Sequence, residues 1–202
     1  MVAIIDYGAG NLHSVKNALD FLGAESVITS DSDEILSADR VILPGVGSFG
    51  DAMGQMRSTG LDVTVKKAAE SGKPFLGICL GLQLLFDESE ESPDVKGLGI
   101  IPGRVVKIKK TDEIKIPHMG WNNITAAKES KILKFPDSSP FVYFVHSYYI
   151  KPDDESVVSA YTEYPDKIAV AVERGNLFAM QFHPEKSGDA GMEILKNFLI
   201  VK

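Results

Sequence analysis

The chain has 202 residues, a length that suits one domain of ordinary size. Hydrophobic residues make up 44% of it and charged residues 24%, which is enough apolar material for a core and excludes disorder as the overall state. With 28 Asp and Glu against 21 Lys and Arg, the net charge is −7. An acidic chain without a basic run lacks the surface that neutralises phosphates, so nucleic acid is not an expected partner.

The cellular compartment is indicated by what the sequence lacks. A single cysteine, Cys79, excludes an internal disulfide and is typical of intracellular proteins. No apolar run approaches the ~18 residues that a membrane span requires. The first residues have neither the basic region nor the cleavage site of a secretory signal. We therefore expect a cytoplasmic protein without a membrane partner.

The N-terminal half alternates short apolar runs with helical patterns. Strands are predicted at residues 2–6, 27–29, 40–43 and 73–78, and helices at 11–22, 49–71 (broken) and 80–86. This alternation predicts βαβ units and a parallel sheet covered on both faces. The acidic residues 87–94 are expected to form a solvated loop.

The C-terminal half is richer in strand patterns and ends in one amphipathic helix. Strands are predicted at residues 104–109, 141–145, 157–161, 168–174 and 177–182, and the helix at 191–201. A two-residue turn at Gly175 and Asn176 predicts a hairpin. The predicted fold class is α/β, with a mostly parallel central sheet, helices on both faces and an added antiparallel β layer. We expect one domain over residues 1–202.

The one cysteine lies in the string G-I-C-L-G at residues 77–81, where a predicted strand runs into a helix. Flanking glycines allow a sharp turn that thrusts a nucleophile outward. Cys79 is therefore the candidate nucleophile, and the backbone N–H of Leu80 is expected to face the oxyanion formed on the attacked carbonyl. A buried structural cysteine is the usual alternative, and the two glycines favour the nucleophile.

A thiol nucleophile needs a base and a group that orients the base. The string H-P-E follows the predicted strand 177–182, so His183 is placed at the carboxyl end of a strand, as is Cys79. Glu185 is positioned to hold the imidazole in one tautomer, which completes a Cys-His-Glu triad. A plain surface turn is the alternative.

The string P-G-V-G at residues 44–47 follows another predicted strand. Its members Gly45, Val46 and Gly47 are candidates to present backbone N–H groups to developing negative charge, although such a string is often only a turn. The G-x-G at residues 8–10 lacks the third glycine of a dinucleotide loop, and no G-K-[ST] occurs. With one cysteine and no H-E-x-x-H, neither a metal nor another cofactor is expected.

Together these strings resemble the class I (triad) glutamine amidotransferases over almost the whole chain. Three further strings narrow the resemblance: D-Y-G-A-G-N-L at residues 6–12, P-H-M-G-W-N at 117–122 and F-V-H-S-Y at 144–148. They are similar to the glutaminase subunits of imidazole glycerol phosphate synthase, a family of histidine biosynthesis.

The resemblance implies that the chain hydrolyses L-glutamine to glutamate and ammonia. It implies a heterodimer with a (βα)₈-barrel cyclase subunit, which uses the ammonia to make imidazole glycerol phosphate and an aminoimidazole carboxamide ribotide. By family position, the substrate-binding residues are Gln83, Ser147 and Tyr148. The implied partner interface comprises Asn11, His118, Met119, Trp121, Asn122, Tyr143 and Lys186.

Three other functions remain as alternatives. The first is a glutaminase subunit of another amidotransferase, such as anthranilate or aminodeoxychorismate synthase, which the string H-M-G-W-N disfavours. The second is a stand-alone cysteine hydrolase of the α/β-hydrolase fold, where the acid precedes the histidine in the chain, whereas Glu185 follows His183. The third is a binding subunit without activity, which would be expected to lack a triad residue.

Overall fold

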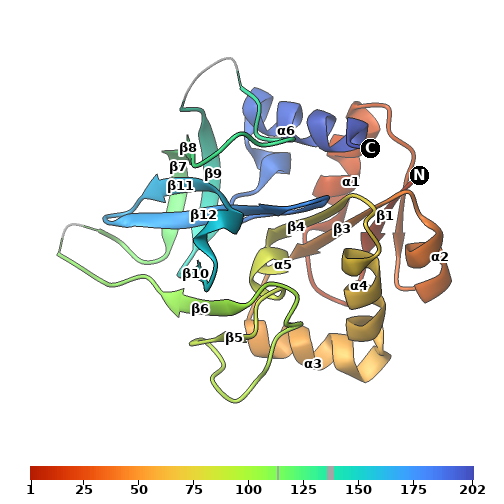
Figure 1. Cartoon of the computed structure of the whole chain (residues 1–202), viewed down its shortest axis with the longest axis horizontal. Coiled ribbons are helices and arrows are strands. Elements are labelled where there is room, and N and C mark those ends of the chain that lie inside the picture. The colour runs from red at the N-terminus through yellow and green to blue at the C-terminus, as the bar shows by residue number, and fades with distance from the viewer. Residues whose placement is uncertain (113, 136–138) are drawn as a thin grey trace.

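A mixed sheet runs through the middle of the protein in the computed structural model, which describes residues 1–112, 114–135 and 139–202 (Figure 1). Five neighbouring strands are parallel and form one half of it: β2 (Ser26–Thr29), β1 (Val2–Ile5), β3 (Arg40–Gly45), β4 (Phe75–Cys79) and β13 (Leu177–Met180). These strands come from both ends of the chain, so the sheet joins its two halves.

The sheet continues through antiparallel strands in its other half. They are β12 (Lys167–Arg174), β10 (Tyr148–Pro152) and β6 (Gly103–Lys107), with β11 (Val158–Glu163), β8 (Thr125–Ala126) and the short β5 (Glu88–Ser89) beside them. The predicted hairpin is confirmed, because β12 and β13 pair across Gly175 and Asn176. Gly175 has a φ of 64°, a conformation that glycine adopts without strain.

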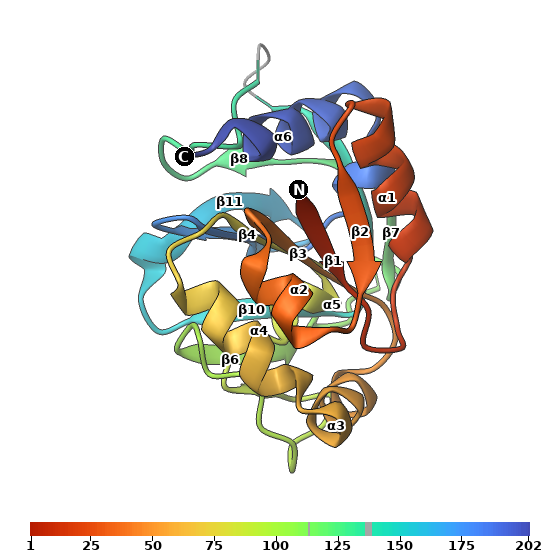
Figure 2. The same ribbon diagram turned by 90° about the vertical axis from the view of Figure 1, so that its right-hand side faces the viewer.

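Helices cover both faces of the parallel half (Figure 2). One face carries α1 (Leu12–Phe21) and α6 (Gly188–Ile200), and the other α2 (Ser32–Ser37), α3 (Phe49–Thr59), α4 (Leu61–Glu70) and α5 (Leu80–Gln83). Along β1 the buried side chains alternate between the two cores: Val2 and Ile4 face α1 and α6, and Ala3 and Ile5 face the other helices. None of the helices among the described residues combines the length and the apolar character that crossing a membrane requires.

A second, two-stranded antiparallel sheet lies beside the main one and is formed by β7 (His118–Asn123) and β9 (Phe141–His146). It packs on the core through Phe144, whose ring meets that of Phe182 edge-on at 5.7 Å. The predicted fold class, including the added antiparallel layer, is confirmed.

Several element predictions need correction. The helix predicted at residues 80–86 is one turn of α5 followed by turns, and α6 begins at Gly188, not at residue 191. Helix α2 was not predicted; it begins because the Asp31 carboxylate accepts hydrogen bonds from the N–H groups of Asp33 and Glu34. Strands β5, β7, β8 and β10 were not predicted either.

The acidic residues 87–94 are not simply a solvated loop. Carboxylates in this stretch accept backbone N–H groups of other segments: Glu91 that of Phe49, at the start of α3, and Glu90 that of Lys107. Glu88 instead pairs with a cation, Lys96, at 2.7 Å. The stretch therefore ties α3 to the antiparallel half of the sheet.

The turn from β4 into α5 is possible because two glycines allow close packing. A Cβ on Gly81 would lie 1.9 Å from the carbonyl oxygen of Leu43 on β3, and a Cβ on Gly77 would lie 3.0 Å from the Cβ of Ala179 on β13. Side chains at these positions would push α5 away from the sheet.

We expect Gly81→Ala to lower the free energy of unfolding by about 3 kcal/mol or more, because its methyl group would overlap backbone that cannot move aside. Gly54→Ala is the matched control, since Gly54 lies inside α3 with nothing within 4 Å of its added Cβ. The control is expected to keep or gain stability, by about 0.5 to 1 kcal/mol. Urea unfolding measures both, and equal stability of the two variants would contradict the steric explanation.

Candidate active site

Three parallel strands end side by side at one edge of the sheet. Gly45 at the end of β3 is in register with Cys79 at the end of β4, and Ile78 is in register with Met180 at the end of β13. His183 follows β13 by three residues. The sheet therefore brings the predicted nucleophile, base and oxyanion loop to one place, where α/β proteins bind their ligands.

Cys79 is held in a strained conformation at this edge. Its φ of 55° is the one positive value of a non-glycine residue in the described part of the chain. Such a conformation costs on the order of 1–3 kcal/mol and persists only where the surroundings impose it. The thiol lies 4.0 Å from the Val145 carbonyl oxygen and 3.6 Å from Nε2 of Gln181. This is the elbow geometry expected from the sequence.

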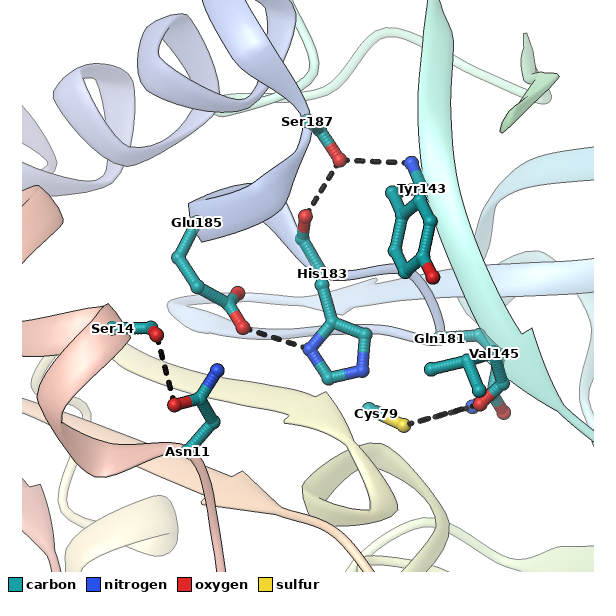
Figure 3. A network of polar contacts seen from close by, with 9 residues as sticks. All are labelled: Asn11, Ser14, Cys79, Tyr143, Val145, Gln181, His183, Glu185 and Ser187. Atoms are coloured by element: carbon teal, nitrogen blue, oxygen red, sulfur yellow. Dashed lines mark hydrogen bonds and ion pairs between the residues drawn. The ribbon is translucent and has the colours of Figure 1, made fainter. Parts of the chain in front are cut away.

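His183 and Glu185 form a buried pair beside Cys79 (Figure 3). Nδ1 of His183 lies 2.8 Å from Oε1 of Glu185, and their side chains are 2% and 1% exposed. The other ring nitrogen, Nε2, faces the side where Cys79 lies and makes no well-aligned hydrogen bond within the described residues. The three predicted triad residues are thus together.

The backbone around His183 is fixed by Ser187, which sequence reasoning did not single out. The Ser187 hydroxyl donates to the His183 carbonyl at 2.6 Å and accepts the N–H of Tyr143 on β9 at 3.0 Å. The His183 N–H donates to the Tyr143 carbonyl at 3.0 Å. These bonds link the short helix η2 (Pro184–Lys186) to the second sheet.

Opposing effects set the charge of His183. Burial lowers its pKa, but the close approach of Cys79, the hydrogen bond to Glu185 and the negative charges of both groups outweigh burial and raise the pKa to about 10. The imidazole is therefore protonated at neutral pH and paired with two acidic groups. An imidazolium beside a thiol favours the reactive thiolate.

A cavity of about 320 Å³ opens above Cys79, large enough for a small polar molecule. Its walls include Val46 and Gly47 of the predicted oxyanion loop and Ser147 and Tyr148 of the predicted substrate site. The other lining residues are Cys79, Leu80, Gln83, Glu91, Pro117, Val145, His146 and His183. Gly45, the remaining loop residue, lies behind this wall in β3, where its added Cβ would meet Leu80 at 2.9 Å.

Two buried glutamines connect the predicted substrate site to the nucleophile. Nε2 of Gln83 donates to Oε1 of Gln181 at 3.0 Å and lies 3.5 Å from the Tyr148 carbonyl oxygen. Nε2 of Gln181 in turn donates to Sγ of Cys79. Gln181 was not predicted as a site residue, although it stands two residues before His183.

Tyr7 was also missed. Its hydroxyl is buried without a hydrogen-bond partner among the described residues, and a Cβ on Gly45 would lie within 2.4 Å of it. Burial and the charge of Cys79 raise the pKa of Tyr7 well above its ordinary value. The hydroxyl therefore stays protonated beneath the oxyanion loop.

Most residues of the implied partner interface lie at one surface. Met119 and Trp121 on β7 are 62% and 56% exposed. The Trp121 ring lies 6.1 Å from that of its cross-strand neighbour Tyr143, and Nζ of Lys186 lies 6.0 Å from the same Tyr143 ring.

The other three interface candidates differ in position. Asn122 is half-buried at the end of the H-M-G-W-N string, and Asn11 stands at the N-terminus of α1, which packs against η2. His118 departs from the expected surface position, because it is 3% exposed and contacts His146. No group of three or more His, Cys, Asp or Glu side chains within the described residues is arranged to hold a metal ion.

Comparisons with known proteins identify the family. Residues 3–202 match the family model "Glutamine amidotransferase class-I". Among curated proteins, the imidazole glycerol phosphate synthase subunit HisH of Geobacillus kaustophilus is 52% identical, covering 98% of this chain and 96% of its own. The HisH of Methanothermobacter thermautotrophicus is 50% identical, covering 98% of both chains. The chain therefore belongs to the class I glutamine amidotransferases and, within them, to the family of HisH subunits, as the sequence predicted.

Solved structures show the same fold at lower identity. A structure described as that of a glutamine amidotransferase covers 99% of this chain and all of its own, with a TM-score of 0.75 and 22% identity. The structure of PurLQS from Thermotoga maritima covers 98% of this chain and 96% of its own, with a TM-score of 0.77 and 20% identity.

We expect Glu185→Gln to lower the pKa of His183, because one of the two negative charges that stabilise the imidazolium is removed. Because Cys79 and Glu185 together hold the folded-state pKa of His183 above the ordinary value of 6.5, protonation of His183 stabilises the fold fully below about pH 6.5, and this effect is lost as the pH rises through about 10. The stability difference between wild type and variant should shrink over that range.

Nitrogen-15 NMR of the histidine rings and urea unfolding at several pH values measure the two effects. Glu193→Gln on α6, where the carboxylate is 40% exposed and pairs with Lys196, is the control and should leave the pKa of His183 unchanged. An unaltered His183 titration in Glu185→Gln would contradict this account.

Proposed function

We propose that this chain is the glutaminase subunit of an imidazole glycerol phosphate synthase, with Cys79 as nucleophile, His183 as acid and base, and Glu185 as the group that orients His183. The observation that carries the proposal is the elbow at Cys79, which stands beside the buried His183–Glu185 pair at the open edge of the sheet. Family membership supports the same activity.

The proposed reaction begins when the Cys79 thiolate attacks the side-chain amide carbon of glutamine. The oxyanion is held by the N–H of Leu80 and by N–H groups of the loop at Gly45, Val46 and Gly47. The protonated His183 gives its proton to the leaving amine, and ammonia departs from a glutamyl thioester.

A second half-reaction restores the enzyme. A water molecule gives a proton to His183 while its oxygen attacks the thioester carbon. The carbon–sulfur bond then breaks, which restores the Cys79 thiolate beside the protonated His183, and the new carboxylic acid leaves and loses its proton to solvent as glutamate. Glutamine and water are thus converted to glutamate and ammonia. In this proposal Gln83, Ser147 and Tyr148 bind the glutamine, because all three line the cavity.

We further propose that the ammonia passes to a barrel-shaped cyclase subunit bound as a heterodimer. Ammonia in bulk water near neutral pH is mostly protonated and cannot act as a nucleophile, so a protected passage is needed. The exposed Met119 and Trp121, with Tyr143 and Lys186 beside them, form the docking surface. We place this complex in the cytoplasm, where the single free cysteine stays reduced.

The alternative glutaminase subunits, of anthranilate or aminodeoxychorismate synthase, are less well supported. The curated relatives at 50–52% identity over nearly the full chain are HisH subunits. A function as a binding subunit alone is disfavoured because Cys79, His183 and Glu185 are present and lie together.

Cys79→Ala is expected to abolish glutamate release while the assembled synthase still turns over with added ammonium salts, because ammonia production and use are separate steps. The measurement is product formation by the complex with glutamine or with ammonium chloride. Ser89→Ala, a buried small-residue change outside the cavity, is the control. Glutamine-dependent turnover by Cys79→Ala would exclude Cys79 as the nucleophile.

The isolated chain is expected to be a poor glutaminase that the cyclase subunit and its nucleotide substrate activate. Val46 is 41% exposed and Gly47 has open space around it, so the peptide between them can turn at small cost. A missing oxyanion donor costs roughly 3 kcal/mol, or on the order of a hundredfold in rate. Steady-state glutamate release by the chain alone and in the complex tests this, and full activity of the lone chain would contradict it.

A further inference from the structure

A line of hydrogen bonds runs from the outer sheet to the wall of the cavity. Nδ2 of Asn122 lies 3.3 Å from Nε2 of His118, and Nδ1 of His118 lies 2.9 Å from Nε2 of His146. Nδ1 of His146 lies 2.8 Å from the carbonyl oxygen of Tyr148. The two imidazoles are 3% and 5% exposed, and the mechanism above uses neither of them.

The Asn122 end of this line has a fixed direction. Its Oδ1 accepts the N–H of Asn123 at 2.9 Å, and its Nδ2 donates to the carbonyl of Glu163 at 3.1 Å. The amide therefore presents an N–H to the imidazole of His118, whose Nε2 must accept it.

The other end imposes the same direction. A carbonyl oxygen can only accept, so Nδ1 of His146 carries the proton that bonds to Tyr148. With His146 neutral, its Nε2 accepts, and the proton at the 2.9 Å contact belongs to Nδ1 of His118. Both ends thus demand the Nδ1-protonated tautomer of both histidines, and every bond points from Asn122 toward Tyr148.

This order exists only while both imidazoles are neutral, because an added proton would set two N–H groups face to face. Burial lowers the pKa of His118 to about 4. Burial also lowers the pKa of His146, to about 3; the bond to the Tyr148 carbonyl raises it, and the charges of His118 and His183 lower it further. Tyr164, another titratable group, stacks its ring on His118 at 3.8 Å.

The carbonyl at the end of the line also borders the reaction site. Nε2 of Gln83 approaches the Tyr148 carbonyl at 3.5 Å and donates to Gln181, which donates to Sγ of Cys79. The Tyr148 carbonyl therefore contacts two sets of side chains. One is the line of hydrogen bonds that ends at His146, and the other is the pair of glutamine amides that reaches Cys79.

We propose that Asn122, His118 and His146 are positioning residues of the glutaminase site: their one-directional line of hydrogen bonds fixes the Tyr148 carbonyl, which orients Gln83 on the cavity wall. The inference rests on the proposed function and adds residues that the proposed mechanism does not use; of the three, His146 also lines the cavity. The same hydrogen bonds connect β7, which carries the proposed docking surface, to the proposed substrate site.

Nitrogen-15 NMR of the full chain tests the line itself, independently of activity, and only four histidines contribute signals. We expect a protonated Nδ1 and a bare Nε2 in both His118 and His146, unchanged between about pH 5 and pH 8. An Nε2-protonated tautomer of either residue, or its titration near the ordinary pKa, would overturn the proposal.

Asn122→Asp tests the direction of the hydrogen bonds by reversing the one between residue 122 and His118. A carboxylate replaces the donor with an acceptor, so His118 should gain an Nε2 proton and the pair should take up a proton at a pKa about 1–3 units higher. Asn122→Ala, which supplies neither donor nor acceptor, is the matched control and should leave the pair neutral. Unchanged tautomers in Asn122→Asp would overturn the proposed direction.

Two amide variants of His146 separate positioning from mere packing. His146→Asn places its amide nitrogen where Nδ1 donates to Tyr148, whereas His146→Gln places it where Nε2 lies. We expect the Asn variant to keep near wild-type kcat in the complex, and the Gln variant to lose about tenfold, the effect of one lost hydrogen bond.

The alkylation rate of Cys79 by iodoacetamide and the melting temperature are measured on the same variants. The Gln variant should differ from the Asn variant in alkylation rate but not in melting temperature. Equal kcat and equal alkylation rates in the two variants would overturn the positioning role. A wild-type complex without glutamate release would instead overturn the proposed function, while the NMR and alkylation results would still decide the inference.

Discussion

The close packing of α5 against β3 determines how the chain turns at Cys79, the last residue of β4. Because a Cβ on Gly81 would lie 1.9 Å from the Leu43 carbonyl oxygen, the chain turns directly after the thiol, at a φ of 55°. The strain is carried by β4, which has parallel partners on both sides in β3 and β13. One of those partners, β3, ends in the loop proposed to hold the oxyanion, and the other, β13, is followed by His183, so one packing constraint places all three groups.

The parts of the fold that could be predicted from the sequence are those whose signals are local. The strand-to-helix elbow around Cys79 and the pair His183 and Glu185 each lie within five residues of sequence, and buried strands stand out as apolar runs. Strand β7 was missed because its two large apolar side chains, Met119 and Trp121, are exposed and its buried residue is His118, so the segment lacks the apolar buried face of a typical strand. Its pairing with β9 makes it a strand.

Other site residues were missed because their signals are not local. Gln181 looks like the continuation of a buried strand, and its role depends on Gln83, 98 residues earlier. The composition of the acidic stretch at residues 87–94 predicts a solvated loop. Composition does not reveal that unpaired N–H groups, such as that of Phe49 at the start of α3, need an acceptor, which Glu91 supplies.

Three buried histidines near one cavity differ in charge because of their partners and not because of burial. Burial lowers the pKa of each. His183 has two acidic groups against its ring and remains protonated, whereas His118 and His146 have an amide, a carbonyl and each other. A group that must donate and recover protons needs charged partners that make both states accessible. A group that must hold a carbonyl still needs neutral partners that permit one arrangement only. The proton transfer proposed for His183 and the positioning proposed for His118 and His146 therefore depend on different partners.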